Sequence, residues 1–125
     1  MFMENIAVFA SGNGTNAENI CDYFSTSKKV RVSLVCTNKK DALVLKKTKR
    51  YGVKQLVFSK EDMNDGNVVE SALKEGGVTF IVLAGFLLKV PQKLTSLFDK
   101  KIINIHPSLL PKYGGKGMFG KNVHR

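Results

Sequence analysis

One stretch near the start of the chain reads Asn5-Ile6-Ala7-Val8-Phe9-Ala10-Ser11-Gly12-Asn13-Gly14-Thr15-Asn16-Ala17. Its first six residues are mostly apolar and predict a buried strand, whereas the residues from Thr15 to Phe24 place apolar side chains at helical spacing. Two glycines lie between these segments. The stretch therefore predicts a strand, a glycine-rich loop and a helix in immediate succession, which is the repeating unit of a parallel sheet.

The same alternation continues along the chain. Four further strands are predicted at residues 30–36, 54–58, 78–83 and 102–105. Helices are predicted between them, one capped by Asp41, one from Asn64 to about Lys74, and one with Pro91 in its first turn. Because the connections are short, we predict an α/β fold: a Rossmann-like, doubly wound parallel sheet of about five strands with helices on both faces.

Composition limits the classes of function. The chain has 125 residues, no apolar run near the roughly 20 that span a bilayer, and no signal-peptide pattern at Met1-Phe2-Met3-Glu4-Asn5. We therefore expect a cytoplasmic protein with no membrane partner. Cys21 and Cys36 are far apart in sequence, which favours small buried thiols over a disulfide. No cluster has metal-ligand spacing, so we expect no metal.

The formal net charge is +10, from 20 basic and 10 acidic residues. The basic residues are spread along the chain and do not alternate with aromatic residues, as a stacking platform for nucleic acid would require. This pattern favours solvated helix faces that steer an anionic small molecule. A basic nucleotide- or nucleic-acid-binding domain stays as the non-enzymatic alternative.

The loop Ser11-Gly12-Asn13-Gly14-Thr15-Asn16 predicts a phosphate site. Its glycines let a ligand approach the backbone, and the N–H groups at the start of the following helix favour an anion. The loop also fits the dinucleotide fingerprint, but Cys36-Thr37-Asn38-Lys39 at the end of the second strand offers no carboxylate for ribose hydroxyls. A phosphate monoester is therefore favoured over a dinucleotide or a purely structural turn.

The last predicted strand ends in two polar side chains, within Ile102-Ile103-Asn104-Ile105-His106-Pro107. Side chains alternate along a strand, so Asn104 and His106 point the same way, and Pro107 ends the pairing. An amide and an imidazole at this edge suit acyl chemistry, in which an oxyanion is stabilised and a proton moves. A structural histidine is the alternative for His106, and His124 is not expected to take part.

A third motif, Leu83-Ala84-Gly85-Phe86-Leu87-Leu88, follows the most apolar strand. Gly85 allows a ligand to approach the backbone closely. The side chains of Phe86, Leu87, Leu88 and Val90 are predicted to wall an apolar pocket for a flat heterocycle. Plain core packing is at least as strong an interpretation for each of them.

Together with Asn104-Ile105-His106-Pro107-Ser108-Leu109-Leu110-Pro111, these motifs resemble the phosphoribosylglycinamide formyltransferase family over essentially the whole chain. The resemblance implies transfer of a formyl group from the co-substrate 10-formyltetrahydrofolate to the amine of glycinamide ribonucleotide in purine biosynthesis. It implies that Ser11 to Asn16 hold the substrate phosphate, that Gly85 to Val90 border the folate pocket, and that Asn104 and His106 are catalytic. A formyltetrahydrofolate deformylase or another formyltransferase is the alternative, because the Asn-x-His element alone does not choose an acceptor.

The resemblance also implies a domain organisation. Residues 1–111 correspond to the amino-terminal α/β domain of the family, and residues 112–125 form a glycine-rich loop and tail. Family members carry a catalytic Asp beyond this point, for which Asp99 is no substitute. We therefore expect the carboxy-terminal part of the family domain to be missing, so that these 125 residues alone have weak or no turnover, whereas a longer parent protein is an active transferase.

Overall fold

The computed structural model describes residues 3–105 and 123–124. Within these residues one sheet has six strands in the order β3-β2-β1-β4-β5-β6. The strands are β1 (Glu4–Phe9), β2 (Val30–Thr37), β3 (Lys54–Val57), β4 (Phe80–Ala84), β5 (Ile102–Ile105) and β6 (Val123–His124). The first five are parallel, as predicted. The short β6 pairs antiparallel with β5 and is not predicted by the sequence.

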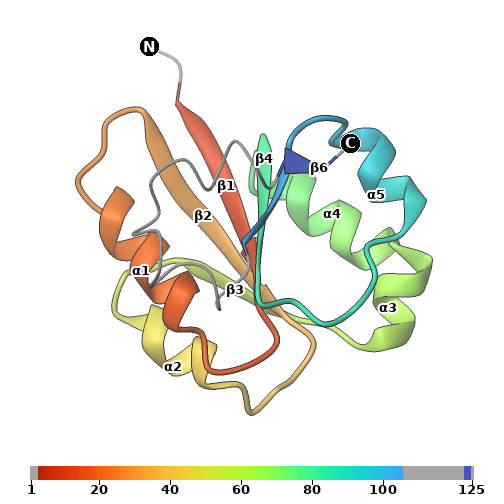
Figure 1. Ribbon diagram of the computed structural model, residues 1–125, viewed down its shortest axis with the longest axis horizontal. Coiled ribbons are helices and arrows are strands. Elements are labelled where there is room, and N and C mark those ends of the chain that lie inside the picture. Colours follow the sequence, from red (N-terminus) through yellow and green to blue (C-terminus); the bar gives the residue numbers. More distant parts are fainter. Residues whose placement is uncertain (1–2, 106–122, 125) are drawn as a thin grey trace.

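Helices cover both faces of the sheet, as the doubly wound fold requires. They are α1 (Thr15–Phe24), α2 (Leu43–Lys49), α3 (Lys60–Asp65), α4 (Asn67–Glu75) and α5 (Gln92–Leu97). Figure 1 shows α1 and α2 on one side of the strands and α3, α4 and α5 on the other. Each side has its own core: Ala17 and Val44 contribute to the first, and Met63, Leu73 and Leu94 contribute to the second.

The central strand β1 explains why its sequence is almost continuously apolar. Val8 belongs to the core beneath α1 and α2, whereas Ala7 and Phe9 belong to the core beneath α3, α4 and α5. All three side chains are at most 1% exposed, so β1 is buried on both faces. A strand in this position cannot alternate apolar and polar residues, which is the usual pattern of buried parallel sheets.

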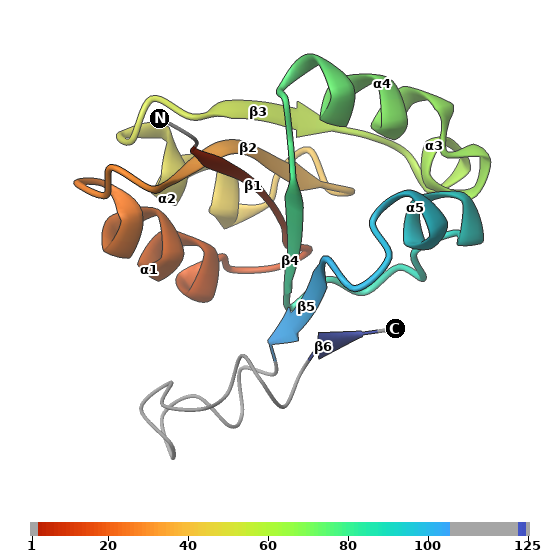
Figure 2. The ribbon, with the colours of Figure 1, turned by 90° about the horizontal axis from the view of Figure 1, so that it is seen from above.

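The chain order fixes where a ligand can bind. From β1 the chain builds outward through β2 to β3, and it then returns to add β4 and β5 on the other side of β1 (Figure 2). The direction of winding therefore changes between β1 and β4. In open α/β sheets the ligand crevice lies outside the carboxyl ends of the strands at such a switch point.

One helical region differs from the sequence prediction. The helix predicted from Asn64 to about Lys74 corresponds to α4, which begins three residues later because Gly66, with a φ of 83°, ends α3 and begins α4; α3 itself is not predicted by the sequence. A capping box begins α3: the Ser59 hydroxyl accepts from the Asp62 amide at 3.0 Å, and the Asp62 carboxylate accepts from the Ser59 amide at 3.0 Å. Reciprocal bonding of this kind satisfies two free helix donors, so it stabilises a helix that apolar spacing does not reveal.

Two predicted helix starts are also shifted. Asp41 is not the cap of α2, because Ala42 occupies that position and no side chain caps the helix. Pro91 is the N-cap residue of α5 and not part of its first turn. In the described part of the chain no helix is long and apolar enough to cross a membrane. The predicted domain boundary after residue 111 falls outside the described residues and stays a prediction.

Candidate active site

The loop after β1 turns sharply into α1. Gly14 is the N-cap residue of α1 and adopts a left-handed conformation with a φ of 76°, which favours glycine. A Cβ placed on Gly12 would meet no atom within 4 Å, so this glycine borders open space. The two glycines therefore have different roles: Gly14 allows the left-handed backbone conformation of the turn, whereas Gly12 leaves the loop accessible to a ligand.

Donors gather at the start of α1. The Asn13 side-chain oxygen accepts from the Thr15 amide at 3.0 Å, so one free donor of the helix start is satisfied. The amides of Asn16 and Ala17 lie in the first turn, where no preceding helical carbonyl is available. The ammonium group of Lys47, in α2, donates a hydrogen bond to the Thr15 hydroxyl at 3.1 Å and adds a positive charge. The predicted phosphate loop thus has the electrostatics of an anion site.

Ser11 is used differently from the rest of the loop. Its side chain is buried, with 1% of its surface exposed. The hydroxyl donates to the Asn38 side-chain oxygen at 2.7 Å and accepts from the Leu87 amide at 2.9 Å. The Ser11 amide donates to the Gly85 carbonyl at 3.2 Å. Through these three hydrogen bonds, Ser11 connects the loops that follow β1, β2 and β4. Its one hydroxyl proton is already donated to Asn38.

The predicted folate residues follow β4 and begin at Gly85, which has a φ of 75°. Phe86 packs edge-on against Phe9 at 5.4 Å between ring centroids and against Phe58 at 6.0 Å. Leu88 and Val90 are half-buried against the same core, whereas Leu87 is 73% exposed. Phe86 therefore anchors this segment in the core, and Leu87 is the predicted pocket residue with the most free apolar surface.

Asn104 lies on the same side of the sheet as these residues. It is opposite Leu83 of β4, which is itself opposite Phe9 of β1. Ile102 belongs to the core beneath α3, α4 and α5, and residues two apart on a strand share a face. The half-buried Asn104 therefore faces that side, at the edge where residues 86–90 pack. His106 lies outside the described residues, so its pairing with Asn104 stays a prediction.

An open groove of about 580 Å³ adjoins the phosphate loop. One wall is the loop after β1 and the other is the segment after β2. The lining residues are Ser11, Gly12, Asn13, Asn38, Lys39, Lys40, Asp41, Ala42 and Leu43. Two exposed lysines against one aspartate give this groove a net positive charge, which fits an anionic ligand.

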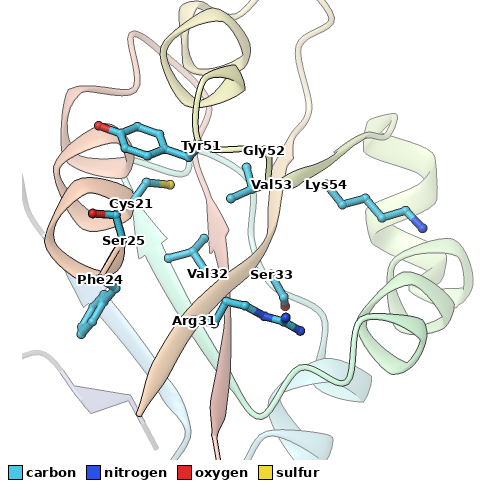
Figure 3. Close-up of a pocket in the computed structure, with 10 residues that line it drawn as sticks. All are labelled: Cys21, Phe24, Ser25, Arg31, Val32, Ser33, Tyr51, Gly52, Val53 and Lys54. Atoms are coloured by element: carbon cyan, nitrogen blue, oxygen red, sulfur yellow. The ribbon is translucent and has the colours of Figure 1, made fainter. Parts of the chain in front are cut away.

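A second pocket, of about 400 Å³, lies near the amino ends of β2 and β3 (Figure 3). Residues from the end of α1, such as Phe24, line it together with Arg31 and Lys54 at the starts of the strands. Lys54 also forms an ion pair with Glu75 at 3.5 Å. None of the predicted site residues that the structure describes lines this pocket, so it is separate from the predicted phosphate and folate loops.

Both cysteines are buried free thiols, as predicted. Desolvation, and to a smaller extent the negative charge of Glu18, raises the pKa of the Cys21 thiol to about 11. Burial alone raises the pKa of the Cys36 thiol. A thiol that stays protonated is a poor nucleophile, so neither residue suits covalent catalysis.

Sequence reasoning missed Asn38 and Lys47. Asn38 follows β2 at the ligand-binding edge; the dinucleotide fingerprint asks only for a carboxylate there, whereas in the structure the Asn38 amide oxygen accepts from the Ser11 hydroxyl. Lys47 is one of several lysines in α2, and only the packing of α2 beside α1 brings its ammonium group to Thr15. Position at the end of a parallel strand was thus a usable signal for Asn38 but not for Lys47.

These features define an α/β protein with an anion-binding loop, an apolar loop and an amide at the switch point of a parallel sheet. A family model described as "Formyl transferase" matches residues 4–123. The chain therefore belongs to the formyl transferase family.

Relatives with the same chemistry in their names cover nearly all of this chain. It is 40% identical to a chloroplastic phosphoribosylglycinamide formyltransferase of Arabidopsis thaliana over 98% of this chain and 44% of that protein. It is 36% identical to a phosphoribosylglycinamide formyltransferase of Haemophilus influenzae over 97% of this chain and 59% of that protein. The chain thus spans about half the length of these curated relatives.

Solved structures agree on the fold. The crystal structure of glycinamide ribonucleotide transformylase 1 from Geobacillus kaustophilus superposes with a TM-score of 0.77 at 35% identity. The match covers 95% of this chain and 66% of that one. The names of these relatives favour glycinamide ribonucleotide formyl transfer over the deformylase and nucleic-acid alternatives.

Proposed function

We propose that this chain forms the substrate-phosphate site and part of the catalytic edge of a phosphoribosylglycinamide formyltransferase. The reaction moves a formyl group from 10-formyltetrahydrofolate to the amine of glycinamide ribonucleotide. The observation that carries the proposal is the contact of Ser11 with Gly85 and Leu87, because it joins the phosphate loop to the apolar loop across the switch point. A phosphorylated substrate and a flat folate then meet at one edge.

The phosphate end of the substrate is assigned to the loop after β1. The amides at the start of α1 and the Lys47 ammonium group supply donors and positive charge. Gly12 leaves room for a phosphate, since nothing lies within 4 Å of its Cβ direction. The Ser11 hydroxyl proton is already donated to Asn38, so this side chain does not donate to the phosphate. Ser11 instead supports the site by holding the backbone of the loop after β1 in place.

The chemical step is assigned to Asn104 and His106. The amine nitrogen attacks the formyl carbon, a C–N bond forms, and the formyl oxygen becomes negative. Asn104 donates an amide N–H to that oxygen. His106 takes up the proton that the amine loses and returns it to the folate nitrogen as the bond between that nitrogen and the formyl carbon breaks.

A transfer assay on the natural protein tests this proposal. With 10-formyltetrahydrofolate present, we expect tetrahydrofolate to be released only after glycinamide ribonucleotide is added. Formate release without glycinamide ribonucleotide would instead identify a deformylase. A steep salt dependence of retention on DNA, without either reaction, would support the nucleic-acid alternative.

A cytoplasmic location is also part of the proposal, supported by two buried cysteines that form no disulfide with each other, as is usual in a reducing compartment. The Arabidopsis relative carries "chloroplastic" in its name, so compartments differ among relatives. Immunodetection of the protein after cell fractionation distinguishes cytoplasm from organelle.

A further inference from the structure

Four residues meet at one partly buried point between the phosphate loop and the apolar loop. They are Ser11, Asn38, Gly85 and Leu87, and we call them the Ser11 junction. We propose that Asn38 is a positioning residue that, through the Ser11 hydroxyl, holds the loop after β4 against the loop after β1. The part of this inference that concerns ligand binding rests on the proposed function, whereas the part that concerns the two loops does not.

The direction of the hydrogen bonds supports this role. A hydroxyl has one proton and two lone pairs. Asn38 accepts the Ser11 proton at 2.7 Å, which leaves a lone pair free to accept from the Leu87 amide at 2.9 Å. Without an acceptor at position 38, the Ser11 proton is free to rotate toward the Leu87 N–H, where it would oppose that bond. Asn38 therefore fixes the orientation that Leu87 requires.

Among residues 3–105, the hydrogen bonds that attach the loop after β4 to neighbouring loops involve Ser11. The Leu87 side chain is 73% exposed and does not anchor the segment, although Phe86 is held by aromatic packing. The Gly85 carbonyl accepts from the Ser11 amide at 3.2 Å, so within the described part of the chain Ser11 makes two hydrogen bonds to this loop. Since Ser11 is only 1% exposed, water cannot readily replace either contact.

A shared attachment of two ligand loops has a thermodynamic consequence. If a phosphorylated ligand steadies the loop after β1, the Ser11 junction also steadies the loop after β4, and the affinity for a folate rises. Linkage requires the same factor in the reverse direction. We therefore expect tetrahydrofolate, which carries no formyl group to transfer, to tighten the binding of glycinamide ribonucleotide by about fivefold.

The first experiment measures hydrogen exchange at the Leu87 amide, with no ligand present. The Ile81 amide serves as an internal reference, since it donates to Lys101 within the sheet. In Ser11→Ala, which removes the acceptor itself, we expect exchange at Leu87 to quicken by about tenfold, as the loss of one hydrogen bond implies. Asn38→Ala is expected to quicken it several-fold, and the double variant is expected to match Ser11→Ala alone.

Two further variants separate positioning from a general loss of structure. Asn38→Asp keeps an oxygen acceptor for the Ser11 proton, so protection at Leu87 should return to the wild-type level. Asn19→Ala removes an exposed asparagine of α1 and should leave exchange at Leu87 unchanged. Unaltered exchange at Leu87 in either Ser11→Ala or Asn38→Ala, or no recovery in Asn38→Asp, would overturn the proposal whatever the protein binds.

The second experiment measures the dissociation constant of glycinamide ribonucleotide with and without tetrahydrofolate. We expect the fivefold factor in the wild-type protein and a factor near one in Ser11→Ala. Failure of both ligands to bind would count against the proposed function and leave the hydrogen-exchange result to decide the role of Asn38. Binding with an unchanged factor in Ser11→Ala would contradict the coupling directly.

Discussion

Gly14 lies directly against Val44: a Cβ built on Gly14 would stand 2.4 Å from the Val44 Cα. The turn that begins α1 therefore packs against the first turn of α2 with no space for a side chain. The same α2 carries Lys47, whose ammonium group contacts Thr15. One glycine thus allows α2 to approach the phosphate loop closely enough to add a positive charge to it.

The first prediction concerns Gly14→Ala. The substitution combines a left-handed backbone, which costs roughly 1–2 kcal/mol, with an overlap against backbone atoms that costs about 1–3 kcal/mol. We therefore expect the free energy of unfolding to fall by at least about 2 kcal/mol in urea titrations. Gly52→Ala is a matched control, because Gly52 has a φ of 70° but open space around its Cβ direction. Equal losses in the two variants would show that contact with Val44 is unimportant.

Gly12→Val tests the phosphate site with little cost to the fold, since a Cβ at this position meets open space in the free protein. We expect affinity for glycinamide ribonucleotide to fall by about tenfold to a hundredfold, the range for hydrogen bonds to a charged group. Titration calorimetry measures this, and Gly12→Ala should lose less. An unchanged affinity in Gly12→Val would remove the phosphate from this loop.

The catalytic assignment predicts an effect on turnover. Asn104→Ala and His106→Ala should each lower kcat of the natural protein by on the order of a hundredfold or more, because oxyanion and proton-transfer groups act mainly in the transition state. The KM for glycinamide ribonucleotide should change little. Near-normal kcat in either variant would show that the residue has another role.

The capping box of α3 predicts a purely structural effect. Ser59→Ala removes the oxygen that accepts from the Asp62 amide and should lower the free energy of unfolding by about 1 kcal/mol. Thermal unfolding measures the change. Ligand affinity should stay constant, since Ser59 is the N-cap residue of α3 and not one of the predicted site residues. A loss of affinity would indicate that α3 supports the site.

Thiol chemistry provides a further test. Because burial raises the pKa of both cysteines, the reactive thiolate is scarce at neutral pH in the folded protein. We expect iodoacetamide to modify neither thiol in the native protein at pH 7.5 and both after unfolding in urea, as measured by intact mass. Rapid modification of the native protein would mean that Cys21 or Cys36 is exposed by local opening.

The sequence predicts the strands and both helix layers well where burial leaves a periodic pattern. β1 and α1 follow from an apolar run and from helical spacing. The short α3 is missed because its signal is the pair Ser59 and Asp62 and not an apolar stripe. Local chemistry of this kind is weaker than periodicity in a sequence, yet it suffices to begin a helix.

The candidate site is predicted as separate motifs but not as a network. Ser11 looks like a phosphate donor in the sequence, because glycine-rich loops use hydroxyls in that way. Its partners lie 27 and 76 residues away, so only the folded chain reveals that the hydroxyl is already engaged. The order of the strands in the sheet brings these partners together, and no single motif in the sequence predicts that order.

The central claim is that one edge of the sheet holds both the phosphate and the reacting amine. A crystal structure of the natural protein with glycinamide ribonucleotide measures this most directly. We predict the phosphate within hydrogen-bonding distance of the amides between Gly12 and Ala17, and the amine directed toward Asn104. A phosphate bound instead among Arg31 and Lys54 in the second pocket, with the Gly12 loop empty, would contradict the account.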